Sequence, residues 1–266
     1  MMTFPVRSLV SVAGTLLGLM VPVVCAAQIL ETETARPLGR GGLELGTNFE
    51  YQASSEGHET ALPFALEYGF TDRFEVLVEP VAYTAIRPNL GSKATGVGDT
   101  EVTLTYLARR ESGGTPALAL AGEVKLPTAK NTLIGTGKTD VAGYLIASKR
   151  MGRFDTHANL GYTIVGRPAG AQLKNIFNFA LASQMTLGQT SELFGEILAN
   201  TASSSGGEPT GPVPPGGVIA EAPTGEIVGS LGIAKYVMPS LRLSLGLSVD
   251  NNGAFQFRPG FTIRRR

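Results

Sequence analysis

LRLSLGLSVD, residues 241–250, alternates apolar and polar or small side chains without a break. The first set is Leu241, Leu243, Leu245, Leu247 and Val249, and the second is Arg242, Ser244, Gly246, Ser248 and Asp250. Because successive side chains of a β-strand point to opposite faces of the sheet, this stretch predicts a strand with one apolar and one polar face. The fold class depends on which face meets water.

The same alternation recurs in segments of about ten residues from residue 43 to the end of the chain. In RFDTHANLGYTI, residues 153–164, Phe154 and Leu160 oppose Asp155, His157 and Asn159. DVAGYLIASKR, residues 140–150, is ambiguous because both of its faces are apolar or small. The count of segments is about twelve, an even number, as bacterial outer-membrane barrels have.

The connections between these segments alternate in length. Short turns are expected at Thr71–Arg73, ESGGTP, MGR, GQTS and MPS. Longer connections are expected at YQASSEGHE, IRPNLGSKATGVG, PTAKNTLIGTGKT, RPAGAQLK and residues 201–223, and only the tight DNNG breaks the order. Such alternation is typical of a barrel with short periplasmic turns and long outer loops.

A soluble β-sandwich would also alternate, with its apolar faces buried between two sheets. The polar faces here carry small residues such as Gly46, Ala65 and Gly161, which suit a confined interior better than a solvent-exposed strand. Aromatic residues gather at strand ends, as membrane interfaces require. We therefore predict an all-β fold: a closed antiparallel transmembrane β-barrel of about twelve strands.

The first residues have the pattern of a signal peptide, with Arg7, an apolar run from Leu9, and a small-residue cleavage site near Ala27. The expected organisation is a signal peptide over residues 1–27 and one barrel domain over residues 28–266. Cys25 is the only cysteine, so the mature chain can form no internal disulfide or thiolate metal site. Lys plus Arg and Asp plus Glu both number 22, which gives no reason to expect nucleic acid as a partner.

The polar faces of the predicted strands carry the residues expected to line the interior. The lumen-lining candidates are Glu67, Glu75, Glu79, Glu101, Glu123, Lys125, Asp155, His157, Asn159, Arg242 and Arg258. Acidic residues outnumber basic ones, so the interior is expected to disfavour small anions and to pass neutral or cationic solutes. An alternative is that these charges pair across the barrel and close it.

Catalytic and metal sites are poorly supported. The two histidines, His58 and His157, have no metal-ligand spacing, and Asp155, His157 and Asn159 lie side by side on one strand face rather than in catalytic geometry. GTGKT from Gly135 is an incomplete phosphate-loop motif with no helix after it. We expect no cofactor, no metal and no enzymatic activity.

Four short motifs carry a family resemblance: GVGD at 96–99, KLPT at 125–128, GTGKTD at 135–140 and HANLGY at 157–162. With this order and spacing, the chain resembles a family of Gram-negative outer-membrane proteins of the meta-pathway of phenol degradation. The resemblance implies a barrel in the cell outer membrane that acts as a channel or transporter for small organic, including aromatic, solutes. One departure is the basic end Arg264–Arg266, where such barrels commonly finish on an aromatic residue.

The expected function is therefore passage of small organic solutes. The expected partners are outer-membrane lipid, the solute and the barrel assembly machinery. Two alternatives remain: a structural or adhesive barrel that uses its outer loops, and a barrel enzyme that acts on lipids. The sequence assigns no role to the loop from 201 to 224.

Overall fold

The computed structural model describes residues 30–203 and 225–265. Fourteen strand segments follow one another: β1 (Leu43–Asn48), β2 (Glu50–Ser54), β3 (Gly57–Gly69), β4 (Phe74–Pro88), β5 (Ala94–Gly96), β6 (Thr100–Arg109), β7 (Ala117–Leu126), β8 (Asp140–Met151), β9 (Phe154–Ile164), β10 (Ile176–Leu187), β11 (Ser191–Asn200), β12 (Glu226–Met238), β13 (Leu241–Asp250) and β14 (Phe255–Arg265). Within the described ranges, no helix is long and apolar enough to cross a membrane. The expected signal peptide lies outside them.

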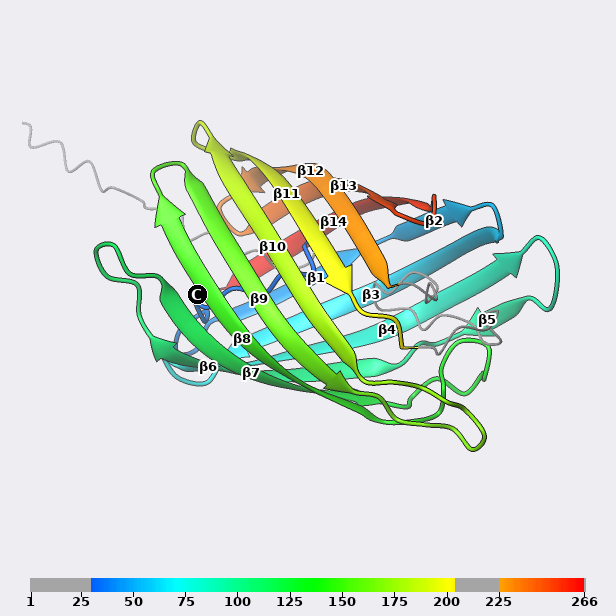
Figure 1. Ribbon diagram of the computed structural model, residues 1–266. Coiled ribbons are helices and arrows are strands. Elements are labelled where there is room, and N and C mark those ends of the chain that lie inside the picture. The colour runs from blue at the N-terminus through cyan, green and yellow to red at the C-terminus, as the bar shows by residue number, and fades with distance from the viewer. Residues whose placement is uncertain (1–29, 204–224, 266) are drawn as a thin grey trace, which may run out of the picture.

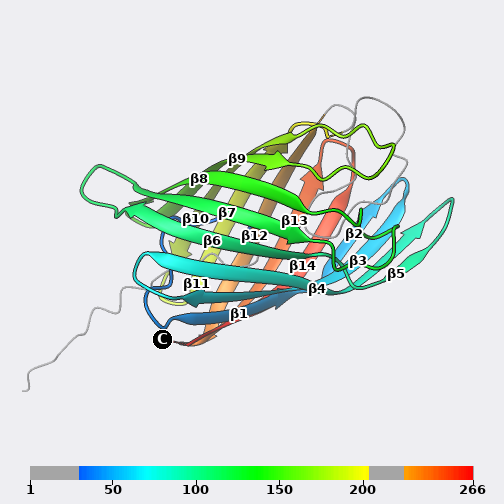
Figure 2. The ribbon, with the colours of Figure 1, turned by 90° about the horizontal axis from the view of Figure 1, so that it is seen from below.

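These segments make twelve strands of one closed barrel. β1 and β2 are two parts of one strand, because both pair with β14 and with β3. β5 and β6 are likewise two parts of one strand that pairs with β4. All pairings are antiparallel, and the pairing of β1 with β14 closes the sheet (Figure 1, Figure 2). The predicted closed antiparallel barrel of about twelve strands is confirmed.

The two ends of the barrel differ in their connections. At one end, called here the turn end, short connections follow β3, β6, β8, β10 and β12, and the C-terminus lies there too (Figure 1). At the other end, called the loop end, longer connections follow β7, β9 and β11, and the tight turn after β13 lies among them. The alternation expected from the sequence is therefore present except after β2, where a tight turn replaces the expected long connection.

The two faces of each strand have opposite exposure. On β13, Arg242 is only 4% exposed, whereas Val249 is 58% exposed. The large exposed hydrophobic residues follow the same outward parity around the barrel, for example Leu120, Leu160 and Leu231. The hydrophobic side chains thus form the outside, which suits a lipid environment.

Aromatic residues lie in pairs near both ends of the outer surface. Phe74 and Tyr106 pack at the turn end with ring centroids 4.8 Å apart. Tyr162 and Phe177 pack at the loop end at 4.7 Å. Two aromatic belts separated by aliphatic strand centres match the two interfaces of a membrane.

Two connections expected to be long are partly strand: YQASSEGHE, and IRPNLGSKATGVG, which contains the end of β4 and all of β5. In YQASSEGHE, β2 and β3 continue almost to the tip, where Ser54 pairs with Gly57. Gly57 has a φ of 147°, and an added Cβ there would lie 2.4 Å from the Arg87 carbonyl oxygen. Backbone hydrogen bonds between β2 and β3 can continue beyond the region in which apolar and polar residues alternate. The alternation in the sequence therefore does not show how far the two strands extend.

We expect the substitution Leu245→Arg to destabilise the barrel by about 2–4 kcal/mol, because Leu245 lies on the outward face at the middle of β13. Urea titration of the protein folded into phospholipid vesicles measures this change. Leu90→Arg is the matched control, since Leu90 is 91% exposed in a loop-end connection, and it should change stability by less than about 0.5 kcal/mol. Equal effects of the two substitutions would contradict a lipid-facing β13.

Candidate functional site: the barrel interior

The interior of the barrel, called the lumen here, carries the charged residues singled out in the sequence. All eleven candidates lie on the inward parity of their strands. Eight of them are buried: Glu67, Glu75, Lys125, Asp155, His157, Asn159, Arg242 and Arg258. The other three, Glu79, Glu101 and Glu123, are half-buried.

Carboxylates face one another across neighbouring strands. Glu44 on β1 stands opposite Glu67 on β3, and Glu79 on β4 stands opposite Glu101 on β6. Glu123 follows on β7, where it stands opposite Thr103. Like charges in directly opposed positions destabilise a sheet. These pairs therefore do not serve stability, and we consider a functional role for them.

The cations of the lumen are largely matched to particular carboxylates. Arg242 Nε donates to Glu192 Oε2 at 2.9 Å. Lys125 Nζ lies 2.5 Å from Asp140 Oδ2. Arg242 is therefore matched to Glu192, whereas Lys125 lies close to Asp140 and also stands directly opposite Glu101 of the β4–β6 pair.

The segment before β1, residues 30–42, runs inside the barrel. Thr32 N and Oγ1 both donate to Glu196 Oε1 on β11, at 2.7 and 2.5 Å. On β8, Ser148 Oγ accepts from Ala35 N at 2.8 Å. Contacts with strands so far apart in the barrel place this N-terminal segment within the lumen.

Further contacts extend the segment along the lumen. Arg258 Nη1 on β14 donates to Glu31 Oε1 at 2.6 Å, and Asn159 Nδ2 on β9 donates to the Glu33 carbonyl at 3.1 Å. Near the turn end, Leu38 N donates to a Glu75 carboxylate oxygen on β4. The segment thus engages both the basic and the acidic parts of the inner wall.

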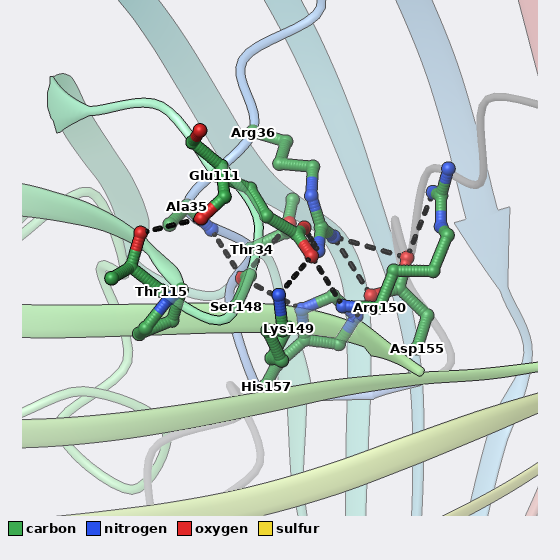
Figure 3. Close-up of polar contacts among 12 residues, drawn as sticks. Thr34, Ala35, Arg36, Glu111, Thr115, Ser148, Lys149, Arg150, Asp155 and His157 are labelled. Carbon is green, nitrogen blue, oxygen red and sulfur yellow. Dashed lines mark hydrogen bonds and ion pairs between the residues drawn. The ribbon is translucent and has the colours of Figure 1, made fainter. Parts of the chain in front are cut away.

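Arg36 is the centre of a charged cluster at the turn end (Figure 3). Its guanidinium donates to both oxygens of Asp155, at 2.8 and 3.0 Å, and to Glu111 Oε2 at 2.7 Å. Lys149 Nζ lies 3.0 Å from Glu111 Oε1, and Arg150 Nη2 lies 3.0 Å from Asp155 Oδ2. Strand ends on β8 and β9 and the β6–β7 turn are joined through one arginine of the N-terminal segment.

Glu111 lies in that turn, between the strands. Partial burial acts to raise its pKa, but hydrogen bonds from Arg36 and Lys149 and from the Arg150 backbone outweigh it and lower the pKa of Glu111 to about 2. The Glu111 carboxylate therefore stays negatively charged at neutral pH and accepts a hydrogen bond from the Arg36 guanidinium.

Ser148, His157 and Asp155 lie together but not as a hydrolytic triad. Ser148 Oγ is 2.8 Å from His157 Nδ1, whereas His157 Nε2 is 3.8 Å from Asp155 Oδ1, beyond a hydrogen bond. Ser148 has no exposed surface, and its oxygen accepts the Ala35 N–H. Ser148 and Asp155 instead hold Ala35 and Arg36 of the N-terminal segment.

In the part of the chain that the structure describes, no three His, Cys, Asp or Glu side chains are arranged to hold a metal ion.

Sequence reasoning missed two features of this interior. The N-terminal segment has no alternating pattern, and many of its contacts use backbone groups that any residue has. Phe194 points inward on β11 and is 2% exposed, although it is apolar. Its ring lies over Gly232, where an added Cβ would be 2.1 Å from Phe194 Cζ. A glycine directly opposite an aromatic residue in the ladder was the available signal.

Three solved structures of similar fold are a channel and two porins. The COG4313 outer membrane channel from Pseudomonas putida F1 is 14% identical with a TM-score of 0.61, covering 87% of this chain and 98% of that one. The NanC porin is 11% identical with a TM-score of 0.57, covering 82% and 98%. The KdgM porin is 9% identical with a TM-score of 0.55, covering 83% and 99%. At such identities the similarity shows the fold.

No curated protein sequence matches the chain. The model of the family described as "Putative MetA-pathway of phenol degradation" matches residues 76–207, which include the four sequence motifs. The resemblance to this phenol meta-pathway family, first indicated by those motifs, is confirmed over that part of the chain.

Proposed function

We propose that the protein is an outer-membrane channel for small organic solutes, and that its lumen favours neutral and cationic solutes over anions. The observation that carries the proposal is the set of facing carboxylates on consecutive strands, with Glu79 opposite Glu101 and Glu123 on the next strand. The fold is one that solved outer-membrane channels use.

The selectivity follows from where the charges lie. A ring of carboxylates in a narrow, low-dielectric pore attracts cations and repels anions. Arg242 and Arg258 are the counter-charges on β13 and β14, but each already pairs with a glutamate, Glu192 and Glu31 respectively. They therefore offer an anion little free positive charge.

The solute class and the location rest on the family and the expected signal peptide. The matching family is described by a pathway of phenol degradation, which supports small aromatic molecules as solutes. The exposed hydrophobic band between two aromatic belts supports insertion in a membrane, with the turn end facing the periplasm. Lipid and the barrel assembly machinery are the partners that such a location entails.

One observation favours a second candidate, a structural or adhesive barrel without transport. The N-terminal segment fills part of the lumen and bonds to β4, β8, β9, β11 and β14. A channel requires this segment to leave space or to move, whereas a structural barrel does not. Conductance of the wild type and of variants with a loosened segment separates the two.

We expect the protein in a planar bilayer under a KCl gradient to show a reversal potential that indicates a higher permeability for K⁺ than for Cl⁻. The double substitution Glu79→Gln and Glu101→Gln should reduce that preference, because it removes two facing charges from the inner wall. Glu56→Gln, in the exposed tip of the β2–β3 hairpin, removes a charge outside the lumen and should leave the reversal potential unchanged. An anion-selective wild type would refute the proposed selectivity.

Arg36→Gln is expected to increase the open time of single channels. The substitution removes charge-assisted hydrogen bonds to Asp155 and Glu111, each of about 1.5–3 kcal/mol, so the fraction of molecules with a released segment should rise about tenfold or more. Arg40→Gln, whose side chain is exposed just beyond the cluster, is the control and should behave as the wild type. Silence of both the wild type and Arg36→Gln, with heat-modifiable gel mobility showing folded barrels, would favour the structural barrel.

The pKa of Glu111 should rise from about 2 toward its ordinary value of 4.5 in Arg36→Gln, since the strongest hydrogen bond to its charged form is lost. Because the folded-state pKa is depressed, the stabilisation by Glu111 is complete above about 4.5 and is lost as the pH falls through about 2. NMR titration of the side-chain carboxyl carbon, assigned with Glu111→Gln, measures both values. An unchanged midpoint would mean that Arg36 does not hold Glu111.

A further inference from the structure

Three of the four family motifs meet inside the barrel at its loop end. Lys125, from KLPT, places Nζ 2.5 Å from Asp140 Oδ2, from GTGKTD, and 4.0 Å from Asp99 Oδ2, from GVGD. The side chains of Lys125 and Asp99 are 9% and 2% exposed. A buried lysine between two aspartates joins segments that are far apart in the sequence.

This ion cluster fixes both ends of the β7–β8 loop, residues 127–139. At the start of the loop, Ala129 N donates to Asp99 Oδ1 at 2.9 Å and Thr128 Oγ1 donates to the Gly98 carbonyl at 3.0 Å. Just after its end, Asp140 Oδ1 accepts from Gly166 N at 2.7 Å. The loop is therefore anchored to the β5–β6 break and to the β9–β10 connection.

The middle of the loop is folded on itself. Asn131 Oδ1 accepts from Leu133 N at 2.9 Å, and the Asn131 carbonyl accepts from Ile134 N at 2.9 Å. This turn directs Ile134 into a cluster with Ala94 and Ala129, where it has no exposed surface. Ile86 and Leu133 pack on the same cluster and are half-buried.

The cluster lies on the inward side of the barrel wall. Ile86 stands opposite both Ala94 and Glu59, and Thr84 stands opposite Gly96 and Ala61, on the face that buries Ala61. An added Cβ at Gly96 would lie 3.2 Å from Ile134 Cδ1, so the loop packs directly against this wall. Figure 1 shows the green loop after β7 beside β5 at the loop end.

We propose that Ile86 and Leu133, supported by the buried side chains of Ala94 and Ile134, form an apolar collar along one side of the outer mouth of the lumen, and that this collar selects solutes with an apolar face. The proposal rests on the proposed channel function and names its specificity element. Deeper along the same strands lie Glu79 and Glu101. A solute entering from outside along this side meets Ile86 and Leu133, with Glu59 beside Ile86, and meets Glu79 and Glu101 further in, which suits a small aromatic molecule with a neutral or cationic polar end.

Gly135 offers a precise way to displace the collar. An added Cβ there would lie 2.7 Å from Ala129 Cβ and 2.9 Å from Asp99 Oδ2, so Gly135→Leu must push the loop away from its anchor. Gly114→Leu is the matched control, because an added Cβ at Gly114, in the β6–β7 turn at the other end, meets no atom within 4 Å. Ile134→Gly is a second variant that removes the anchoring side chain without adding bulk.

The first measurement tests where the loop lies. Thr84→Cys is placed under the loop, since Thr84 has no exposed surface, and a membrane-impermeant maleimide is added to intact cells. We expect slow labelling in the otherwise wild-type chain and in Gly114→Leu, and labelling at least about tenfold faster in Gly135→Leu or Ile134→Gly. Equal labelling in all four folded chains would refute the collar.

The second measurement tests selection. Bi-ionic reversal potentials in planar bilayers compare benzyltrimethylammonium with tetraethylammonium, two fixed cations of which one carries an aromatic ring. We expect the wild type and Gly114→Leu to favour the aromatic cation, and Gly135→Leu and Ile134→Gly to lose about fourfold of that preference, the effect of roughly one buried methylene. An unchanged ratio in conducting variants would refute the collar and leave the channel intact, whereas a wild type that conducts neither cation would refute the channel and the collar together.

Discussion

The structure depends on the requirement that every backbone N–H and C=O be paired where lipid surrounds the chain. In this chain the requirement is met by pairing the first strand with the last, β1 with β14, so that no strand edge stays open. Closure fixes more than the backbone. Once the sheet is a cylinder, each side chain faces either lipid or the lumen. The alternation of LRLSLGLSVD therefore places Leu245 on the lipid side and Arg242 on the lumen side.

Closure also concentrates charge. Carboxylates that would be dilute on an open surface face one another between β1 and β3 and between β4 and β6 in the lumen. The N-terminal segment complements this wall, because it supplies backbone N–H donors to Glu75 and Glu196 and a guanidinium to Asp155. The acidic wall and the segment within it are therefore two parts of one electrostatic arrangement.

Sequence reasoning succeeded where one physical pattern determined the result. Strands with one apolar and one polar face, such as β9 and β13, were assigned correctly, because lipid and lumen demand opposite side chains. β8 stayed ambiguous since Ala142 and Ile146 both face inward and are buried, and Ile146 packs with alanines of β7 and with Ala35 of the N-terminal segment. The inward position of the N-terminal segment and of the β7–β8 loop depends on single long-range contacts, such as Arg36 to Asp155 and Ala129 to Asp99, which leave no periodic signal.

Different interactions hold the chain segments at the two ends of the lumen. At the turn end, Arg36 binds carboxylates through several short hydrogen bonds, and such contacts respond to charge. At the loop end, a buried ion cluster holds a loop whose contact with the wall is apolar, through Ile134 and Ala94. Apolar packing is insensitive to salt, whereas partly exposed ion pairs weaken as salt rises. Ionic strength should thus act on the contacts of the N-terminal segment at the turn end more strongly than on the apolar contacts of the β7–β8 loop at the loop end.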